Sequence, residues 1–364
     1  MLEAFLRVID GAHSNAIPWV ADISYWIDVQ VATGGGPSAW QSELGYLELC
    51  AELGCMPYQW YEHWNPYQVA YDSQVDCYER QSAALKSIRW STSLGEIRKE
   101  WTYSPASHSW APTHYPVQSA EDLKILLYVL RHRRLEPAHL ADYRQRMSLW
   151  AEYDGLPGIG MTQDPLAQTM IFWAGVTNTA YLMADCPDLM RELYLTMVDQ
   201  EQNVIDAICE LTPPLVHVID NQSSEIMAGY FEEHMAPRYR RIITNFHAAG
   251  IRVVTHIDGT MWPLLTMTES AGFDGAEALT PKPAGDLTAE EIASRVTRDD
   301  FVLWGGIPAF MFSATGQQCW PTLRTHLESI LEAWQGHLFI VGVGDCVPAN
   351  GQIELLSKIG DMLA

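Results

Sequence analysis

The sequence has few basic residues and no long apolar run. Against 45 acidic residues it carries only 22 lysines and arginines, which leaves a formal net charge of -23. This charge disfavours nucleic acid and anionic membrane surfaces as partners, and it disfavours a substrate with many carboxylates. No apolar stretch has the length of a membrane span, and the first residues lack the pattern of a secretion signal. We therefore expect a soluble, cytoplasmic protein.

Paired cysteines and nucleotide-binding loops are also missing. The seven cysteines are scattered without a CxxC pair, which favours a reducing compartment. No GxGxxG or GxxxxGKS/T loop follows an expected strand, so nucleotide binding through such loops is not expected. With 364 residues, 48% of them hydrophobic, the chain can bury the core of one large α/β barrel or of two ordinary domains.

Strand and helix patterns alternate along most of the chain. Eight short segments have the apolar, β-branched composition of buried strands, and helical sequence follows each of them. The segments are Ile17–Tyr25, Cys55–Tyr61, Gly158–Gln163, Leu215–Asp220, Ile251–His256, Gly275–Leu279, Phe301–Gly305 and His337–Val343. This alternation predicts an α/β protein with a (β/α)8 TIM barrel as a single domain over 1–364, with a doubly wound open sheet as the alternative.

Two additions to the barrel are expected. An apolar-rich N-terminal extension over 1–16 could form a homodimer contact. An aromatic-rich insertion over about 58–118 contains a predicted β-hairpin, formed by Leu85–Thr92 and Glu96–Tyr103 around a Ser-Leu-Gly turn. Helices are predicted from Ser119, whose hydroxyl would cap the first turn, and over Pro187–Leu211 and Thr260–Ala271.

The candidate site lies in the stretch from Ile251 to Thr280. His256 and Asp258 end one predicted strand, and Glu277 lies on the next. Parallel strands end at the same edge of a sheet, where α/β barrels bind their ligands, so we expect these side chains to lie close together. Asp220 ends the preceding strand and is a candidate to orient substrate or to act as general acid.

Several segments resemble the uroporphyrinogen decarboxylase-like superfamily, and more closely its corrinoid-linked methyltransferase branch. The resemblance runs from about Ser119 to the C-terminus. It depends on YPVQSAEDLK (115–124), VIDNQSSEIMAGYFEEHMAPRYRRI (218–242), VVTHIDGTMWPLL (253–265), and LTPKPAGDLT followed by VLWGGIP. It implies a (β/α)8 barrel. The Arg-rich segment by which the decarboxylases hold propionate and acetate groups has no counterpart near Ile17 to Trp26.

The resemblance also implies a zinc site. The coenzyme M branch holds zinc with a His-x-Cys pair and a Cys after the last strand. His256 and Cys346 match by position, whereas Asp258 stands where the middle Cys would be. His256, Cys346 and one carboxylate, either Asp258 or Glu277, would suffice for zinc. A carboxylate in place of a thiolate makes the site harder, which favours an ether oxygen over a thiol.

The function expected from the resemblance is that of a cobalamin-dependent methyltransferase component of the O-demethylase type. It would move a methyl group from a small methoxylated or methylated compound to a corrinoid protein, with zinc as Lewis acid. Asn221, Trp60 and Tyr25 are candidate substrate-binding residues. The alternatives are a metal-free lyase that uses Asp220 and His256 on a small carboxylic acid, and a barrel without catalytic activity.

Each site residue also has a structural alternative. His256 could be a buried histidine paired with a neighbouring strand, and Cys346 could be a core thiol. Asp258 could cap the helix expected from Thr260, and Glu277 could form an ion pair inside the barrel. Asn221 could belong to a turn.

Overall fold

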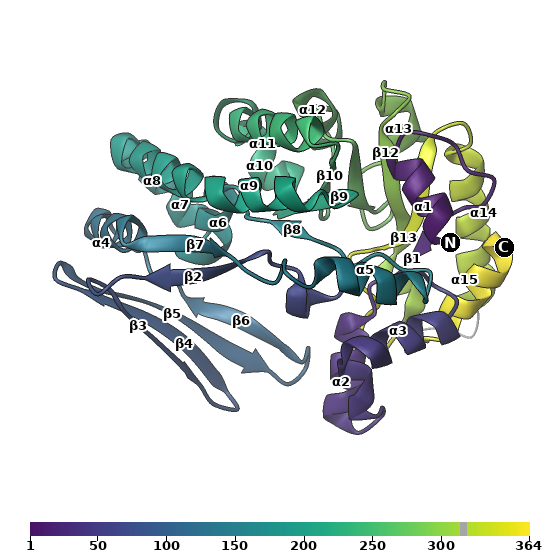
Figure 1. Ribbon diagram of the computed structural model, residues 1–364, viewed down its shortest axis with the longest axis horizontal. Helices are drawn as coiled ribbons and strands as arrows, with labels where there is room; N and C mark the ends of the chain where they lie inside the picture. Colours follow the sequence, from purple (N-terminus) through teal and green to yellow (C-terminus); the bar gives the residue numbers. More distant parts are fainter. Residues whose placement is uncertain (314–318) are drawn as a thin grey trace. The chain divides into compact units, whose positions relative to one another are not determined.

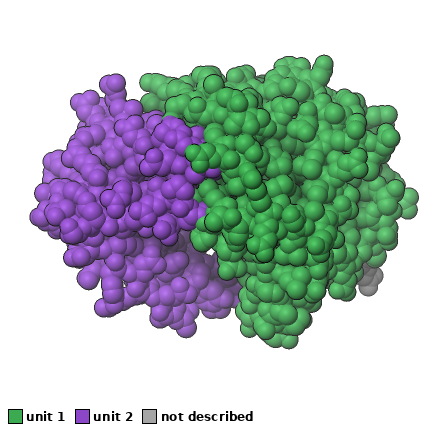
Figure 2. Space-filling view, in the orientation of Figure 1, with its two compact units in different colours: residues 1–66, 139–161, 209–364 green, residues 67–138, 162–208 purple. Residues whose placement is uncertain are grey.

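The computed structural model describes residues 1–313 and 319–364. The described chain divides into two compact units, which Figure 2 colours separately. Unit 1 comprises Met1–Pro66, His139–Met161 and Cys209–Ala364, and unit 2 comprises Tyr67–Ala138 and Thr162–Ile208. All eight strand segments predicted for the barrel lie in unit 1 except the last two residues of Gly158–Gln163.

A parallel sheet forms the centre of unit 1 (Figure 1). Its seven strands are arranged in the order β1, β13, β12, β11, β10, β9, β8. Their bounds are β1 (Trp19–Val20), β8 (Gly160–Met161), β9 (Leu215–Gln222), β10 (Arg252–Ile257), β11 (Gly275–Leu279), β12 (Val302–Pro308) and β13 (Leu338–Gly344). Because each of these strands matches a predicted segment, the alternating pattern located them correctly.

An eighth segment, around Met56 to Tyr58, connects the two edges of this sheet. Met56 forms a parallel bridge with Val20, and its N–H donates to the carbonyl of Trp19 at 2.9 Å. On the other side, the Gly158 N–H donates to the Tyr58 carbonyl at 3.2 Å. The sheet therefore closes in the manner of a (β/α)8 barrel, as predicted.

Helices of unit 1 cover the outside of the sheet. They are α2 (Ser24–Thr33), α3 (Glu43–Glu52), α5 (Tyr143–Ala151), α10 (Ser224–Tyr230), α11 (Ala236–Ala248), α12 (Leu264–Ala271), α13 (Ala289–Arg295), α14 (Cys319–Ala333) and α15 (Leu355–Leu363). The helix expected from Thr260 begins only at Leu264. The N–H groups of Met261 and Trp262 instead donate to the Asp286 carboxylate, at 2.8 and 3.1 Å.

The N-terminal extension packs into the barrel. Helix α1 (Leu2–Ile9) buries Phe5, Val8 and Ile9 in the same core cluster as the inward residues Val254 and Val302. The Phe5 ring contacts Trp304 edge to face, with 5.3 Å between the ring centroids. The apolar face of this helix is therefore used inside the chain, and the predicted homodimer contact stays a prediction.

Unit 2 contains most of the aromatic-rich insertion, residues 67–118, while residues 58–66 lie in unit 1. Its strands are β2 (Tyr67–Tyr71), β3 (Asp76–Gln81), β4 (Leu85–Thr92), β5 (Gly95–Ser104), β6 (Ser109–His114) and β7 (Arg133–Pro137). Its helices are α4 (Ala120–Arg131), α6 (Pro165–Gln168), α7 (Val176–Asp185), α8 (Pro187–Gln200) and most of α9 (Gln202–Leu211). The predicted hairpin is present as β4 and β5, at the centre of a four-stranded antiparallel sheet. Ser119 caps α4 as predicted, since its side chain accepts from the Asp122 N–H.

A buried lysine fixes one helix end in unit 2. Lys99 on β5 is 1% exposed, and its Nζ donates to the carbonyls of Ile171 and Phe172 at 3.1 and 2.6 Å. These carbonyls lie at the end of a π-helical turn, Thr169–Trp173. The ammonium also lies 4.3 Å from the centroid of the Phe172 ring. Lys99 therefore satisfies carbonyls that the turn leaves unpaired.

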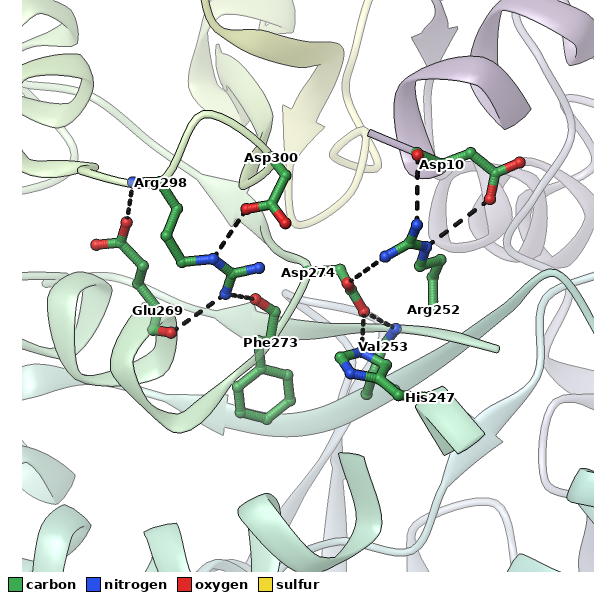
Figure 3. Close-up of polar contacts among 9 residues, drawn as sticks. All are labelled: Asp10, His247, Arg252, Val253, Glu269, Phe273, Asp274, Arg298 and Asp300. Atoms are coloured by element: carbon green, nitrogen blue, oxygen red, sulfur yellow. Dashed lines mark hydrogen bonds and ion pairs between the residues drawn. The ribbon is translucent and has the colours of Figure 1, made fainter. Parts of the chain in front are cut away.

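A polar network joins the starts of β10 and β11 (Figure 3). Asp274, just before β11, accepts from the Val253 N–H at 2.7 Å and from Arg252 at 3.1 Å. Beside it, Arg298 donates to the Phe273 carbonyl at 2.7 Å. These groups lie at the strand ends opposite to those that carry His256 and Glu277. In barrels that end supports stability, while the other end carries chemistry.

None of the helices described for residues 1–313 and 319–364 is both long and apolar enough to cross a membrane.

Candidate metal centre

The centre of the site is a buried pair formed by His256, near the carboxyl end of β10, and Glu277, in the middle of β11. His256 and Glu277 are register partners in the two parallel strands, so their side chains point to the same face of the sheet. The His256 Nδ1 lies 2.5 Å from Oε2 of Glu277, and their side chains are 8% and 2% exposed. The sequence prediction that these two residues lie close together is confirmed.

This pair is ionised. Burial opposes a charge on His256, but the negative Glu277, with help from Asp345 and Asp258, outweighs it and raises the pKa of His256 to about 9. Burial likewise opposes the Glu277 carboxylate, yet the His256 imidazolium and His217 lower the pKa of Glu277 to about 2. Near neutral pH, in the absence of a metal ion, the pair is an imidazolium and a carboxylate.

A third residue, His217 on β9, was not singled out from the sequence. Its side chain is fully buried, and its Nε2 lies 3.4 Å from the same Glu277 Oε2. The rings of Tyr58, Trp64 and Trp304 surround it, with centroids 6.1, 5.6 and 5.9 Å from the imidazole. Burial lowers the pKa of His217, although Glu277 partly compensates, so this imidazole is neutral. The only signal in the sequence was a histidine between apolar residues of a strand, which is typical of a core position.

Together the three side chains suit a divalent metal ion. Their ligand atoms all lie within 4.8 Å of one another, and all three residues are buried. Neither ring nitrogen of His217 makes a well-aligned hydrogen bond among the described residues, so a buried donor atom is available. Two imidazoles and one carboxylate are a common ligand set of catalytic zinc.

Cys346 and Asp258, the other predicted metal-site residues, lie at the loops. Cys346 follows β13, and its Sγ lies 3.7 Å from the Asp345 carboxylate. Burial, and then Asp345, raises the pKa of this thiol well above its usual range. It is not among the three grouped residues, and its role as ligand stays a prediction. Asp258 is exposed and does not cap α12, whose N-cap is Pro263, so that structural alternative is wrong.

Asp22, which follows β1, is another buried side chain that was not singled out from the sequence. It is 4% exposed and accepts from the Tyr61 hydroxyl at 2.6 Å and the Ser24 hydroxyl at 2.6 Å. Burial raises the pKa of Asp22 to about 6, although these hydrogen bonds oppose the rise. Asp345 acts on both Asp22 and His256, so carboxylates from several strand ends share one region of the barrel.

Asp220 and the predicted substrate-binding residues have different surroundings. Asp220 is fully buried and accepts from the Tyr239 hydroxyl of α11 at 2.6 Å. Asn221 is exposed and has a φ of 45°, a backbone region that asparagine tolerates well. Trp60 is half-buried, and its ring packs on Tyr46 at 5.2 Å between centroids. Tyr25 is half-buried on α2. Catalysis and substrate binding by these residues stay predictions.

Comparisons with known proteins place the chain in a family. The sequence profile of the family described as uroporphyrinogen decarboxylase matches residues 131–360. No curated protein matches the chain by sequence. A methyltransferase from Methanosarcina mazei has the same fold, with a TM-score of 0.62 and 13% sequence identity, and the similarity covers 99% of this chain and 97% of that one.

A more limited similarity links the chain to a B12-independent methionine synthase from Shewanella sp. W3-18-1. The TM-score is 0.44 at 8% identity, covering 73% of this chain and 74% of that one. At 13% identity, the similarity to the Methanosarcina mazei protein establishes fold and not activity. The sequence profile, by contrast, spans more than half of the chain. On that ground, and with the barrel that the structure contains, this protein belongs to the uroporphyrinogen decarboxylase family.

Proposed function

We propose that this protein is a methyltransferase that moves a methyl group from a small methoxylated or methylated compound to a corrinoid carried by a partner protein. The observation that carries the proposal is the buried His256–Glu277 pair with His217 beside it, at the strand ends where barrels perform chemistry. Further support comes from the full-length fold similarity to a methyltransferase.

Electrostatics at the site support a neutral or weakly charged methyl donor. Apart from Glu277, the charged groups that act most strongly on His256 are the carboxylates of Asp345 and Asp258. Asp22, whose pKa burial raises to about 6, adds a further negative charge to this region above that pH. A donor with several carboxylates would be repelled here, whereas an aromatic or aliphatic ether would not.

The side chains would act on the oxygen that leaves the methyl group. Demethylation of an ether breaks the methyl carbon–oxygen bond, and the departing oxygen keeps the electron pair and must be neutralised. His256 and Glu277 would hold zinc with a third residue, for which the sequence predicts Cys346 and the structure offers His217. Zinc would supply Lewis acidity toward that oxygen, and the partner's corrinoid would supply a strong nucleophile for the methyl group. Glu277 also fixes the orientation of the His256 ring through its contact with Nδ1.

Zinc content and demethylation test the proposal together. His256→Ala should lose bound zinc and reduce methyl transfer by about 100-fold or more, because the leaving oxygen loses its electrostatic partner. The measurements are elemental analysis of the purified protein and methyl transfer from methoxylated compounds to an added corrinoid protein. The exposed His13 provides a control, since His13→Ala should leave both unchanged. A protein that transfers methyl groups with no metal bound would refute the zinc part.

A metal-free lyase is the second candidate, because decarboxylation is the reaction for which the family is named. In that case the protonated His256 and Asp220 would act on a small carboxylic acid. Release of carbon dioxide without any corrinoid, and its loss in Asp220→Asn, would favour the lyase over methyl transfer.

A further inference from the structure

His217 lies one layer deeper in the barrel than His256. In the register of β9 and β10, His217 is the partner of Val254, two residues before His256 on the same strand. The two imidazole centroids are 6.4 Å apart, and Glu277 on β11 approaches both rings. The neighbouring strands β9 and β10 thus each direct one imidazole toward the Glu277 carboxylate of β11.

The His217 ring has no other polar function in the described structure. Its two nitrogens are fully buried and lack well-aligned hydrogen bonds, and the approach to Glu277 at 3.4 Å is long for one. A buried imidazole in an aromatic surrounding costs stability unless a nitrogen is used, so a partner for it is expected. Three aromatic rings surround the His217 imidazole on its other sides, those of Tyr58, Trp64 and Trp304. None of them is a hydrogen-bond acceptor as strong as the Glu277 carboxylate.

Asp258, which stands where the coenzyme M branch has its middle cysteine, is not placed as a metal ligand would be. Asp258 is exposed on the loop after β10, whereas His217 is buried beside the two residues that form the pair. Replacing a sulfur ligand therefore does not require Asp258, because an imidazole from the neighbouring strand is already in reach.

We propose that His217 is a ligand of the same metal ion as His256 and Glu277, which gives a centre with two imidazoles, one carboxylate and no sulfur. This inference depends on the metal part of the proposed function. The centre would take zinc, for which two histidines and a glutamate form a known catalytic set.

Zinc titration and cobalt substitution of the intact protein test the ligand set. His217→Gln should weaken zinc binding by roughly tenfold or more, while Cys346→Ser should bind zinc like the unaltered protein. With Co²⁺ in place of zinc, the unaltered protein should lack the intense near-ultraviolet absorption of a cobalt–thiolate bond. X-ray absorption at the zinc edge of the unaltered protein should detect nitrogen and oxygen ligands without sulfur, and this holds even if His217→Gln folds poorly.

Unchanged zinc affinity in a folded His217→Gln protein would overturn the inference, and so would a thiolate band that disappears in Cys346→Ser. Failure of the proposed function has a different signature. If zinc is bound through His217 but no methyl group is transferred to a corrinoid, the ligand set stands and the activity does not. If methyl transfer persists while zinc binding is independent of His217, the activity stands and the ligand set does not.

Discussion

At the scale of single residues, the site is dominated by one shared carboxylate. Glu277 contacts His256 at 2.5 Å and His217 at 3.4 Å, and its other oxygen accepts from Gln59 Nε2 at 3.4 Å. A buried carboxylate is tolerated only with such partners, because its desolvation is costly. The two histidines differ in charge because only His256 approaches the carboxylate closely enough to offset burial.

Metal-free protein should lose stability at alkaline pH through this pair. The pKa of His256 in the folded protein, about 9, exceeds its ordinary value of 6.5. Its contribution to the free energy of unfolding is therefore complete below pH 6.5 and is lost as the pH rises through 9. The Glu277 pKa, about 2, lies below the ordinary 4.5, so its contribution is complete above pH 4.5 and is lost toward pH 2. Between pH 6.5 and 9 the loss should be about 3 kcal/mol at most.

Urea denaturation at pH 6 and pH 9.5, with metal removed by a chelator, measures this loss. Glu277→Gln removes the carboxylate. In this variant the part of the stability difference between pH 6 and pH 9.5 that the ion pair causes should disappear. An unaltered protein that is equally stable at both pH values would show that the pair is not ionised as described.

At the scale of elements, the two ends of the barrel strands have different tasks. The starts of β10 and β11 are joined by Asp274, whereas their ends carry His256 and Glu277. Asp274 lies directly before β11, and its buried side chain, 3% exposed, accepts from the Val253 N–H of β10. The network in Figure 3 therefore fixes the register that brings His256 beside Glu277 at the other end.

Removal of this acceptor should destabilise the barrel without direct damage to the site. Asp274→Ala leaves the buried Val253 N–H without its acceptor and removes one of the two acidic partners of Arg252, which keeps Asp10. We expect a loss of about 2–4 kcal/mol in unfolding free energy. Asp300→Ala removes a carboxylate that is 56% exposed and contacts Arg298 in the neighbouring group of Figure 3, and it should cost less than about 1 kcal/mol. Denaturation of both variants provides the comparison, and equal losses would contradict the argument.

At the scale of the whole molecule, composition limits the substrates. A net charge of -23, together with the carboxylates of Asp22, Asp258 and Asp345 in the site region, disfavours a substrate with many carboxylates. We therefore predict that membership of the family does not extend to the reaction in the family's name.

We expect no decarboxylation of uroporphyrinogen, whose acetate and propionate groups would be repelled at this site. The measurement is carbon dioxide release and product analysis under anaerobic conditions, with an authentic uroporphyrinogen decarboxylase as the positive control. Turnover comparable to that control would show that the charge argument fails.

The sequence by itself determined the barrel and two of the three residues of the candidate metal centre. The seven strands of the sheet and the eighth segment around Met56 follow from local composition, because buried parallel strands need continuous β-branched and apolar residues. His256 and Glu277 could be paired because each ends or occupies a recognisable strand, and neighbouring parallel strands share an edge. The long helix expected over Pro187–Leu211 is instead α8 and α9, with a break at Glu201. Helical periodicity does not reveal that a side chain such as Glu201 accepts from Thr162.

Only the tertiary structure decided the surroundings of His217 and Asp22. In the sequence His217 is one polar residue in an apolar strand, and such a residue can point to a core, a ligand or a partner. Its surroundings come from Tyr58, Trp64 and Trp304, which are distant along the chain. Burial, the distance to a carboxylate and the resulting charge depend on which segments meet across the barrel, and those contacts are a property of the folded chain alone.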